Sequence, residues 1–269
     1  MKRLFIAGIV AALTIGGYTA IDTHAADPAR GQAQPVLDQS AADQKYTFLL
    51  FYKADDQATR SMAQALRTSI AGRSDQATVC YVAVTDPAEQ AIVKRFGVAR
   101  APLPFTLAVA PNGAVTGLIS KKVTEAQIAS AFVTTGMADC MKAMQDQKLV
   151  LVCVHTSARS QTPAAVLDFQ SDPEFKDRLS VISIQSSDTA EAPFLKQMEI
   201  VPASLKKSMV VFLAPPAVLV GKFTSSATKA EMAAALHAAG KCCDDPNCKH
   251  GHNHGHSPQA TKAPSAKRK

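Results

Sequence analysis

The densest group of reactive side chains lies near the C-terminal end of the chain. Three thiols and four imidazoles fall within fifteen residues there: Cys242, Cys243, Cys248, His250, His252, His254 and His256. Thiolate and imidazole are ligands that zinc, copper and nickel favour in proteins. Asp245-Pro246-Asn247 predicts a turn that brings Cys243 back toward Cys248, and Gly and Asn between the histidines leave each imidazole reachable. The sequence therefore predicts a transition-metal site (zinc, copper or nickel), and no organic cofactor.

Other interpretations of this cluster stay open. The spacing does not match a structural zinc finger cleanly, so a metal ion bound here is expected to exchange readily. The cysteines could instead form a disulfide, such as Cys243 with Cys248 or a bond to Cys140. An expression tag and metal binding without a biological purpose are further alternatives, although the interspersed Gly and Asn speak against a tag. After His256, the Ser, Pro, Ala and Lys composition is typical of a disordered basic end.

The first residues have the layout of a secretory signal peptide. A basic start at Met1-Lys2-Arg3 precedes an apolar run over Leu4–Ile15, and small and polar residues then lead to cleavage positions after Ala25 or Ala26. We predict a signal peptide at residues 1–25 and a periplasmic or secreted protein. The alternative is an uncleaved membrane anchor, because the run extended to Ile21 approaches the length that spans a bilayer. Membrane contact is expected only through this segment.

The net charge of +7 is unevenly distributed along the chain. The signal segment carries +1 and the tail from Lys241 onward carries +4, which leaves about +2 for the body between them. A nucleic-acid-binding protein needs a concentrated basic face on its folded part. The sequence therefore excludes DNA and RNA as partners, and the partners expected are metal ions or another exported protein.

The elements that must carry the tail are repeated with a period of about 104 residues. Thr124–Phe132 (TEAQIASAF) returns as Thr228–Leu236 (TKAEMAAAL), each with a Thr N-cap before apolar residues at helical spacing. Leu107–Val115 returns as Val211–Leu219, an apolar strand, a Pro-containing turn and a second strand. The repeat predicts a linker at 26–34, two domains of one fold at 35–136 and 137–240, and a flexible tail at 241–269.

Each unit has the same order of expected elements. In the first unit these are a helix at 35–44, a strand at 46–52, a helix at 57–71, a strand at 77–84, a helix capped by Asp86-Pro87, a strand pair at 105–119 and a helix from Thr124. In the second they are a strand at 149–155, a helix beginning near Asp172-Pro173, a strand at 179–184, a helix at 189–198, a strand pair at 209–223 and a helix from Thr228. This alternation predicts an α/β fold with mixed sheets.

That order resembles thioredoxin. Phe51–Arg60 (FYKADDQATR) is similar to the thioredoxin segment Phe-Trp-Ala-x-Trp-Cys-Gly-Pro-Cys-Lys, and Phe96–Pro102 to the stretch that leads to the family's cis-proline. Pro111-Asn112-Gly113 is similar to the hairpin turn that follows, and the second unit matches mainly at Ile200-Val201-Pro202 and its hairpin. The resemblance implies two tandem thioredoxin-like domains over about residues 35–240.

The resemblance also implies which residues replace the redox cysteine pair. Asp56 and Thr59 take the two positions in the first unit, and approximately Ala158 and Gln161 take them in the second. Thioredoxin chemistry needs a low-pKa thiolate at a helix N-terminus and a second thiol that resolves the mixed disulfide. Since sulfur is missing from both sites, we expect two redox-inactive domains and a protein that is not an enzyme.

The family's cis-proline lies beside a peptide-binding groove, and its position here is ambiguous. Spacing from Phe96-Gly97-Val98 selects Pro102, whereas spacing back from Asn112-Gly113 selects Pro104. The candidate groove residues implied by the resemblance are Asp56, Thr59, Pro102, Pro104 and Pro202. A proline at a strand entrance also has a purely structural explanation.

Two further sets of side chains could do chemistry. Asp55 and Asp56 could act as acid–base groups or hold a hard cation, but Asp is a favoured N-cap and suits the positive end of a helix dipole. Cys153 and His155 alternate on one strand and so face the same side, yet a strand cysteine among valines is expected to be buried and inert, as is Cys80.

Three functions follow from these observations. The leading one is a non-enzymatic exported binding protein, with a thioredoxin-like scaffold and a Cys/His-rich metal-binding tail, acting in metal sequestration, delivery or sensing. The second is a protein-interaction or chaperone module, which an exposed apolar groove near Pro102 or Pro104 would favour. The third is a thiol oxidoreductase that uses Cys242, Cys243 and Cys248 as a mobile dithiol.

Overall fold

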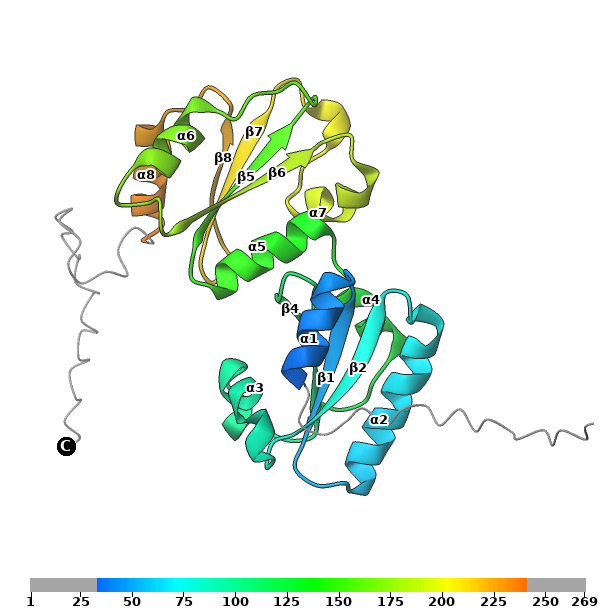
Figure 1. The fold of residues 1–269 in the computed structure, drawn as a ribbon. Helices are drawn as coiled ribbons and strands as arrows, with labels where there is room; N and C mark the ends of the chain where they lie inside the picture. The colour runs from blue at the N-terminus through cyan, green and yellow to red at the C-terminus, as the bar shows by residue number, and fades with distance from the viewer. Residues whose placement is uncertain (1–32, 241–269) are drawn as a thin grey trace, which may run out of the picture.

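The computed structural model describes residues 33–240, which form two α/β domains in succession (Figure 1). The predicted signal segment at 1–25 and the predicted tail at 241–269 lie outside the described residues. The last two residues of the predicted linker belong to the first helix, which begins at Ala33. Within residues 33–240, none of the helices combines the length and the apolar character needed to cross a bilayer.

The first domain consists of α1 (Ala33–Ala42), β1 (Tyr46–Tyr52), α2 (Gln57–Ile70), a 3-10 turn (Ala71–Arg73), β2 (Ala77–Ala83), a 3-10 turn (Pro87–Glu89), α3 (Gln90–Arg95), a 3-10 turn (Val98–Arg100), β3 (Phe105–Val109), β4 (Val115–Ile119) and α4 (Glu125–Ala131). Its strand order is β2-β1-β3-β4. β1 is parallel to β2 and antiparallel to β3, and β3 and β4 form an antiparallel hairpin.

The second domain consists of α5 (Thr135–Gln145), β5 (Leu149–His155), α6 (Ala164–Ser171), β6 (Leu179–Gln185), a 3-10 turn (Thr189–Glu191), α7 (Ala192–Gln197), a 3-10 turn (Pro202–Ser204), β7 (Met209–Ala214), β8 (Val218–Thr224) and α8 (Lys229–Ala238). Its strand order, β6-β5-β7-β8, has the same pattern of parallel and antiparallel pairs. The α/β class and the two tandem thioredoxin-like domains with mixed sheets are confirmed.

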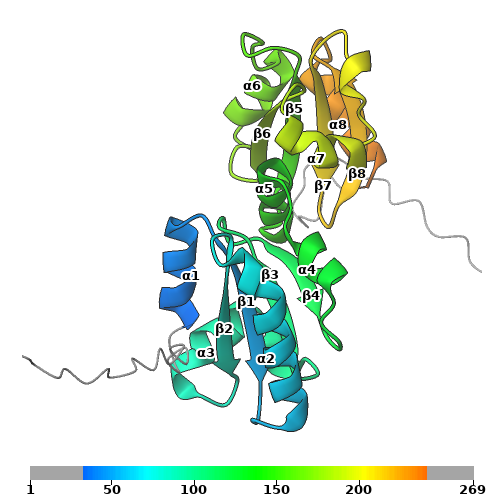
Figure 2. The ribbon, with the colours of Figure 1, turned by 90° about the vertical axis from the view of Figure 1, so that its right-hand side faces the viewer.

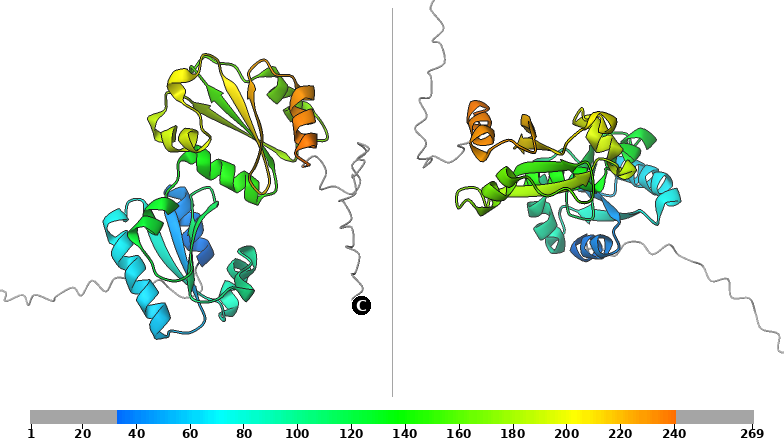
Figure 3. Two further views of the ribbon diagram at one scale, coloured as in Figure 1. Left: turned by 180° about the vertical axis from the view of Figure 1, so that it is seen from behind. Right: turned by 90° about the horizontal axis from the view of Figure 1, so that it is seen from above.

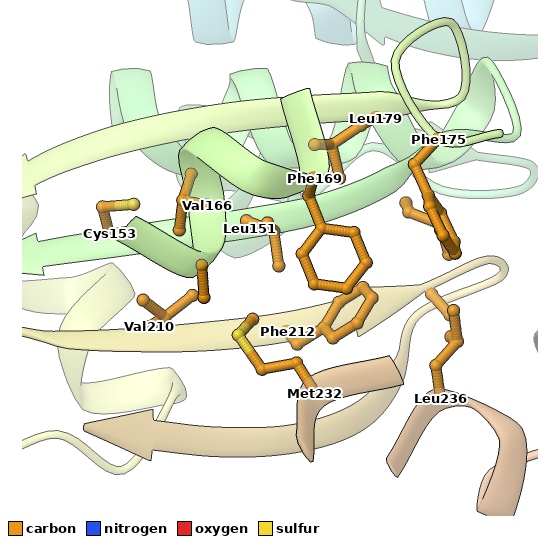
Figure 4. Packing of buried hydrophobic residues seen from close by; sticks show 13 residues of the cluster. Leu151, Cys153, Val166, Phe169, Phe175, Leu179, Val210, Phe212, Met232 and Leu236 are labelled. Atoms are coloured by element: carbon orange, nitrogen blue, oxygen red, sulfur yellow. The ribbon is translucent and has the colours of Figure 1, made fainter. Parts of the chain in front are cut away.

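Both sheets are covered by helices on their two faces, which explains why the central strands β1 and β5 are apolar on both sides. In the first domain, α2 and α4 pack on one face and α1 and α3 on the other (Figures 1 and 2). In the second, α6 and α8 cover one face around Phe169 and Phe212 (Figure 4), and α5 and α7 cover the opposite face. Each domain therefore has two apolar cores separated by its sheet.

One helix predicted from the sequence is wrong. Asp172-Pro173 was expected to begin a helix, whereas α6 ends at Ser171 and Asp172 is its C-cap. The Asp172 carboxylate accepts a hydrogen bond from the Glu174 N–H at 2.8 Å, which closes a turn after the helix. Asp-Pro suits a helix start, but proline is equally common just beyond a helix end because it cannot continue the helix.

A helix that the sequence did not predict, α5, precedes β5 as α1 precedes β1. Asp-Gln-Lys ends both segments, and the glutamines Gln44 and Gln147 adopt left-handed φ angles of 56° and 59°. The Lys45 N–H donates to the Ser40 carbonyl at 2.7 Å, and the Lys148 N–H to the Ala143 carbonyl at 2.9 Å. The two units thus share the same lead-in helix, and α5 is part of the repeat.

The domains meet where α5 lies against the β3–β4 hairpin of the first domain (Figure 3). The Gln145 amide donates to the Val115 carbonyl at 2.7 Å and accepts from the Val115 N–H at 2.9 Å. The Asn112 amide donates to the Asp139 carboxylate at 2.8 Å. Three buried alanines also pack together here and allow a close approach of α5 to the hairpin: Ala110, Ala114 and Ala138. The interface therefore combines side-chain hydrogen bonds with a cluster of small apolar residues.

Candidate functional site

The first domain has a groove at the N-terminal end of α2. Its volume is about 480 Å³, and it is lined by Lys53, Ala54, Asp56, Thr59, Ala99, Arg100, Ala101, Leu103 and Pro104. These residues come from the loop after β1, the first turn of α2, and the segment that leads into β3. The structure therefore brings together three of the candidate groove residues, Asp56, Thr59 and Pro104.

The side chains at the two positions that the resemblance assigns to the redox cysteines bond to nearby backbone groups. The Asp56 carboxylate caps α2 by accepting from the Thr59 N–H at 2.8 Å. The Thr59 hydroxyl donates to the Ala54 carbonyl at 2.9 Å, and Thr59 is buried. The hydrogen bond from the Thr59 backbone N–H is the largest cause that lowers the pKa of Asp56, so this carboxyl is suited to stay ionised. The geometry matches a structural cap, and neither side chain offers a nucleophile for thiol chemistry.

The groove is polar and its charge is mixed. Lys53 and Arg100 contribute cations beside the Asp56 carboxylate. The neighbouring Asp55 lies outside the lining and pairs with Arg60 at 3.5 Å on the surface. The lining therefore mixes charged side chains with small apolar ones, and Leu103 and Pro104 are its larger apolar residues.

The structure distinguishes between the two candidate prolines of the first domain. The Leu103–Pro104 peptide bond is cis, and Pro104 lies directly before β3 and lines the groove. Pro102 lies two residues earlier and is not among the lining residues. Pro104 therefore occupies the position that the resemblance assigns to the family's cis-proline.

The second domain departs from this arrangement. Ser208 directly precedes β7, where Pro104 precedes β3, and its hydroxyl accepts from the Thr156 N–H at 3.3 Å. Pro202 begins a 3-10 turn six residues earlier and does not occupy the corresponding place. Ala158 and Gln161 lie in the loop before α6 and not at its first turn, because α6 begins at Ala164 after Pro163.

The cysteines of the described residues are buried thiols. Cys80, Cys140 and Cys153 are reduced and at most 8% exposed. Burial raises their pKa to about 12, 11 and 11, and the Glu89 charge adds to the rise at Cys80. Cys153 lies among Val166 and Val210 under α6 (Figure 4). A thiol nucleophile needs the opposite, a lowered pKa and exposure, so none of these three thiols is suited to act as a free thiolate nucleophile at neutral pH.

The structure does not describe the predicted metal ligands. Cys242, Cys243, Cys248, His250, His252, His254 and His256 all lie outside the described residues. Between residues 33 and 240, no three His, Cys, Asp or Glu side chains gather as a group that could hold a metal ion.

Sequence reasoning missed a pair of buried carboxylates. Glu89 is 2% exposed and accepts from the Ala33 N–H at 3.2 Å, and Glu191 is 7% exposed and accepts from the Gly136 N–H at 2.8 Å. Each thus fixes the first turn of the lead-in helix of its own domain. The repeat could have revealed them, because each glutamate is the last residue of an Asp-x-Ala-Glu segment. These segments lie directly before α3 and α7.

No family model and no curated protein matches this chain. Among solved structures, the NTD_N/C domain of alkylhydroperoxide reductase AhpF from Enterococcus faecalis is similar at 14% identity and a TM-score of 0.28, covering 75% of this chain and 98% of its own. Human ERp44 in a zinc-bound form is similar at 9% identity and a TM-score of 0.34, over 78% of this chain and 60% of its own.

The first two thioredoxin domains of Eps1p from Naumovozyma dairenensis are similar at 10% identity and a TM-score of 0.27, covering 73% of this chain and 89% of that one. All three likenesses are weak in sequence and in superposition. The strand order and helix placement identify the fold, which is a tandem of two thioredoxin-like domains.

Proposed function

We propose that this chain is an exported, non-enzymatic binding protein, in which a thioredoxin-like scaffold carries a Cys/His-rich metal-binding tail for metal sequestration, delivery or sensing. One observation carries the proposal. The helix N-terminus at which thioredoxin chemistry would take place holds the Asp56–Thr59 cap, in which both side chains are already engaged.

The remaining sulfur chemistry supports the same conclusion. The three thiols within the scaffold are buried and have raised pKa values, which opposes thiolate formation at neutral pH. The ligand-rich sequence lies after α8, which ends at Ala238 and is followed by Gly240 in a left-handed conformation with φ of 65°. Such a glycine is a common helix stop, so the fold is completed before the Cys/His segment begins.

The test compares metal binding by two full-length chains. In one, Cys242, Cys243 and Cys248 become Ser and His250, His252, His254 and His256 become Asn; the other is wild type. Titration with zinc, copper and nickel is expected to show bound metal that these substitutions remove, while the thermal unfolding midpoint stays unchanged. A chain that ends at Gly240 provides a second control, because it keeps every described element. Equal binding by wild type and variant contradicts the proposal.

An insulin-reduction assay separates this function from a thiol oxidoreductase. The wild-type chain is expected to be inactive with dithiothreitol as the electron source. Activity that disappears when Cys242, Cys243 and Cys248 are replaced by Ser would assign dithiol chemistry to the tail and reject the non-enzymatic proposal.

A second candidate, a protein-interaction module, is favoured by the open groove beside Pro104. Its two cations, Lys53 and Arg100, suit an extended acidic segment of another exported protein. Reversal of both charges by K53E/R100E is expected to abolish binding of acidic peptides on an array and to leave metal binding by the tail unchanged.

A further inference from the structure

The second domain contains a cavity whose lining is rich in sulfur. Its volume is about 630 Å³, and it lies between α5, α7 and the β7–β8 hairpin. Five of the lining residues carry sulfur: Met137, Cys140, Met141, Met144 and Met198. The whole chain has eight methionines, so half of them line this one cavity. Such a concentration at one place calls for a chemical explanation beyond general apolarity.

Four of these side chains share one face of the sheet. Met137, Cys140 and Met144 lie at helical spacing i, i+3 and i+7 on α5, which places them in one row along the helix. Met198 caps the C-terminus of α7, and all four belong to the same apolar cluster. Met141 lies on another side of α5 and packs with the interface alanines. The row on α5 and Met198 therefore face a common space.

The first domain provides an internal control for whether the fold needs sulfur there. With the Asp-Gln-Lys ends of α1 and α5 in register, Met137, Cys140 and Met144 correspond to Gln34, Leu37 and Ala41. The residue that caps α3, as Met198 caps α7, is Phe96. The same lead-in helix and second helix thus form in the first domain without a single sulfur at these four positions. The sulfur is a feature of the second domain and not a requirement of the fold.

The chemistry of these groups selects a soft monovalent metal. Thiolate and thioether sulfur prefer copper(I), whereas zinc and nickel sites in proteins draw on imidazole, carboxylate or several thiolates. The cavity is lined mainly by apolar side chains, with Lys222 and Glu199 as its charged residues. One thiolate with one Cu⁺ is neutral, so binding adds no net charge to this lining. We propose that Cys140, Met144 and Met198, with Met137 at the mouth, form a copper(I) site inside the second domain. This site is separate from the tail and goes beyond the proposed function.

Binding follows a balanced exchange at Cys140. The S–H bond breaks, an S–Cu bond forms, and the proton leaves to solvent; copper is supplied as Cu(I) and remains Cu(I), and the thioethers donate without changing protonation. Burial of Cys140 penalises an unpaired thiolate, and a bound metal cation offsets that penalty. Cys140, Met144 and Met198 are 8%, 7% and 9% exposed, whereas Met137 is only partly buried and gives the ion a path inward.

The experiment uses a full-length chain in which the seven Cys and His ligands of the tail are replaced by Ser and Asn. Cu(I) is titrated anaerobically in competition with bicinchoninate, whose copper complex is coloured. One tightly held Cu(I) per chain is expected, with release of one proton, and X-ray absorption is expected to show sulfur alone in the coordination shell. Because the tail is silenced, the result is independent of whether the tail binds metal.

Variants locate the site. M144L and M198L nearly conserve volume and are expected to weaken Cu(I) binding by at least about 10- to 100-fold, the loss that even an outer-shell partner causes at metal sites. C140A is expected to abolish proton release. The matched controls are C153A and M232L, which alter a buried thiol and a buried thioether on the opposite face of the same sheet, and they are expected to leave binding unchanged.

Three outcomes overturn the proposal: no Cu(I) retained against bicinchoninate, equal weakening by C153A or M232L, or nitrogen and oxygen in the coordination shell. If C140A fails to fold, as judged by its circular dichroism, the M144L and M198L measurements still decide. The two proposals can fail separately. If the tail of the wild-type chain binds no metal while the internal site still binds Cu(I), only the proposed function is rejected.

Discussion

At the residue scale, the proposed function depends on Asp56 and Thr59 at the N-terminus of α2, the positions that the resemblance assigns to the redox cysteines. Asp56 and Thr59 line the groove with Pro104, so the surroundings of a thioredoxin-like site are kept while its reactive atoms are missing. Both positions line the groove in the structure, and peptide binding there stays a prediction. The structure adds that their side chains are held by backbone hydrogen bonds.

Replacement of both residues by cysteine tests this placement. In a chain whose tail cysteines are replaced by Ser, D56C/T59C is expected to form an intramolecular disulfide and to gain insulin-reducing activity. The helix N-terminus is expected to hold the pKa of the thiol introduced by D56C about one unit or more below the ordinary ~8.5. The single variants D56C and T59C serve as controls and are expected to stay inactive. A double variant that fails to form the disulfide would show that the two positions are not a redox-site equivalent.

The two buried glutamates are a second residue-scale feature, and they make a stability prediction. E191A is expected to destabilise the second domain by about 1–3 kcal/mol, because it leaves the Gly136 N–H without its buried acceptor. E89A is expected to act similarly on the first domain. Urea unfolding followed by circular dichroism measures both, with D75A on an exposed turn as the control.

Gly136 allows a double-mutant test of the same contact. A Cβ at this position would lie 2.9 Å from Glu191 Oε2 and 2.9 Å from Ile184 Cδ1. G136A alone is therefore expected to destabilise the domain, and E191A is expected to relieve part of that clash. Additive effects of the two substitutions would mean that the two residues are not in contact.

At the element scale, the repeated helices α4 and α8 carry matched N-terminal capping boxes. Thr124 and Gln127 form the box of α4, and Thr228 and Glu231 form that of α8. The two boxes differ in one respect, since Glu231 titrates and Gln127 does not. Hydrogen bonds from the Thr228 backbone, and then from its side chain, lower the pKa of Glu231 from 4.5.

The difference between the two capping boxes predicts that the stability contributed by the α8 box depends on pH and that the contribution of the α4 box does not. A lowered carboxyl pKa stabilises the fold above about pH 4.5, and this contribution is lost as pH falls through the folded-state pKa. T228A and T124A are each expected to lower stability by about 1 kcal/mol at pH 7. The effect of T228A should shrink in acid, whereas that of T124A should stay constant. Nuclear magnetic resonance should show the pKa of Glu231 partly restored in T228A, because its backbone donor remains.

The elements also show how far sequence reasoning reaches. The strands at 46–52 and 149–155 were predicted to the residue, because central strands of a covered sheet are unbroken apolar runs. The helix at Asp172-Pro173 was wrong because a helix stop and a helix start use the same residues. α5 was missed because Gly136 near its start weakens the helical signal.

The candidate site divides in the same way. Asp56, Thr59 and a proline before β3 follow from local sequence, whereas the choice of Pro104 over Pro102 depends on loop conformation that spacing cannot supply. The sulfur cavity depends on α5 and α7 packing on the same face of the sheet, which brings residues 137–144 close to Met198 although they are far apart in the sequence. The metal-binding tail stays a prediction.

At the scale of the whole molecule, the two domains are held together by a few polar contacts on α5. The amide of Gln145 bonds to both backbone groups of Val115. Interfaces this limited between domains usually permit relative motion. The orientation of the domains therefore depends on a small number of side chains.

Q145A is expected to loosen this arrangement without unfolding either domain. Loss of its two partly exposed hydrogen bonds should lower overall stability by about 1–2 kcal/mol. Small-angle X-ray scattering should show a broader distribution of interdomain distances, and amide relaxation should show more independent tumbling. Q170A, on the exposed side of α6, is the matched control. Scattering curves that coincide for Q145A and wild type would show that the alanine contacts suffice.

The double use of α5 has a mechanical consequence. The helix lines the cavity of the second domain through Cys140 and Met144 and contacts the first domain through Asp139, and Gln145 does both. Whatever fills or empties that interior must either leave α5 in place or shift it, and a shift would tilt the neighbouring domain with it. If copper binding at the proposed site shifts α5, the first domain is expected to change its position together with the helix.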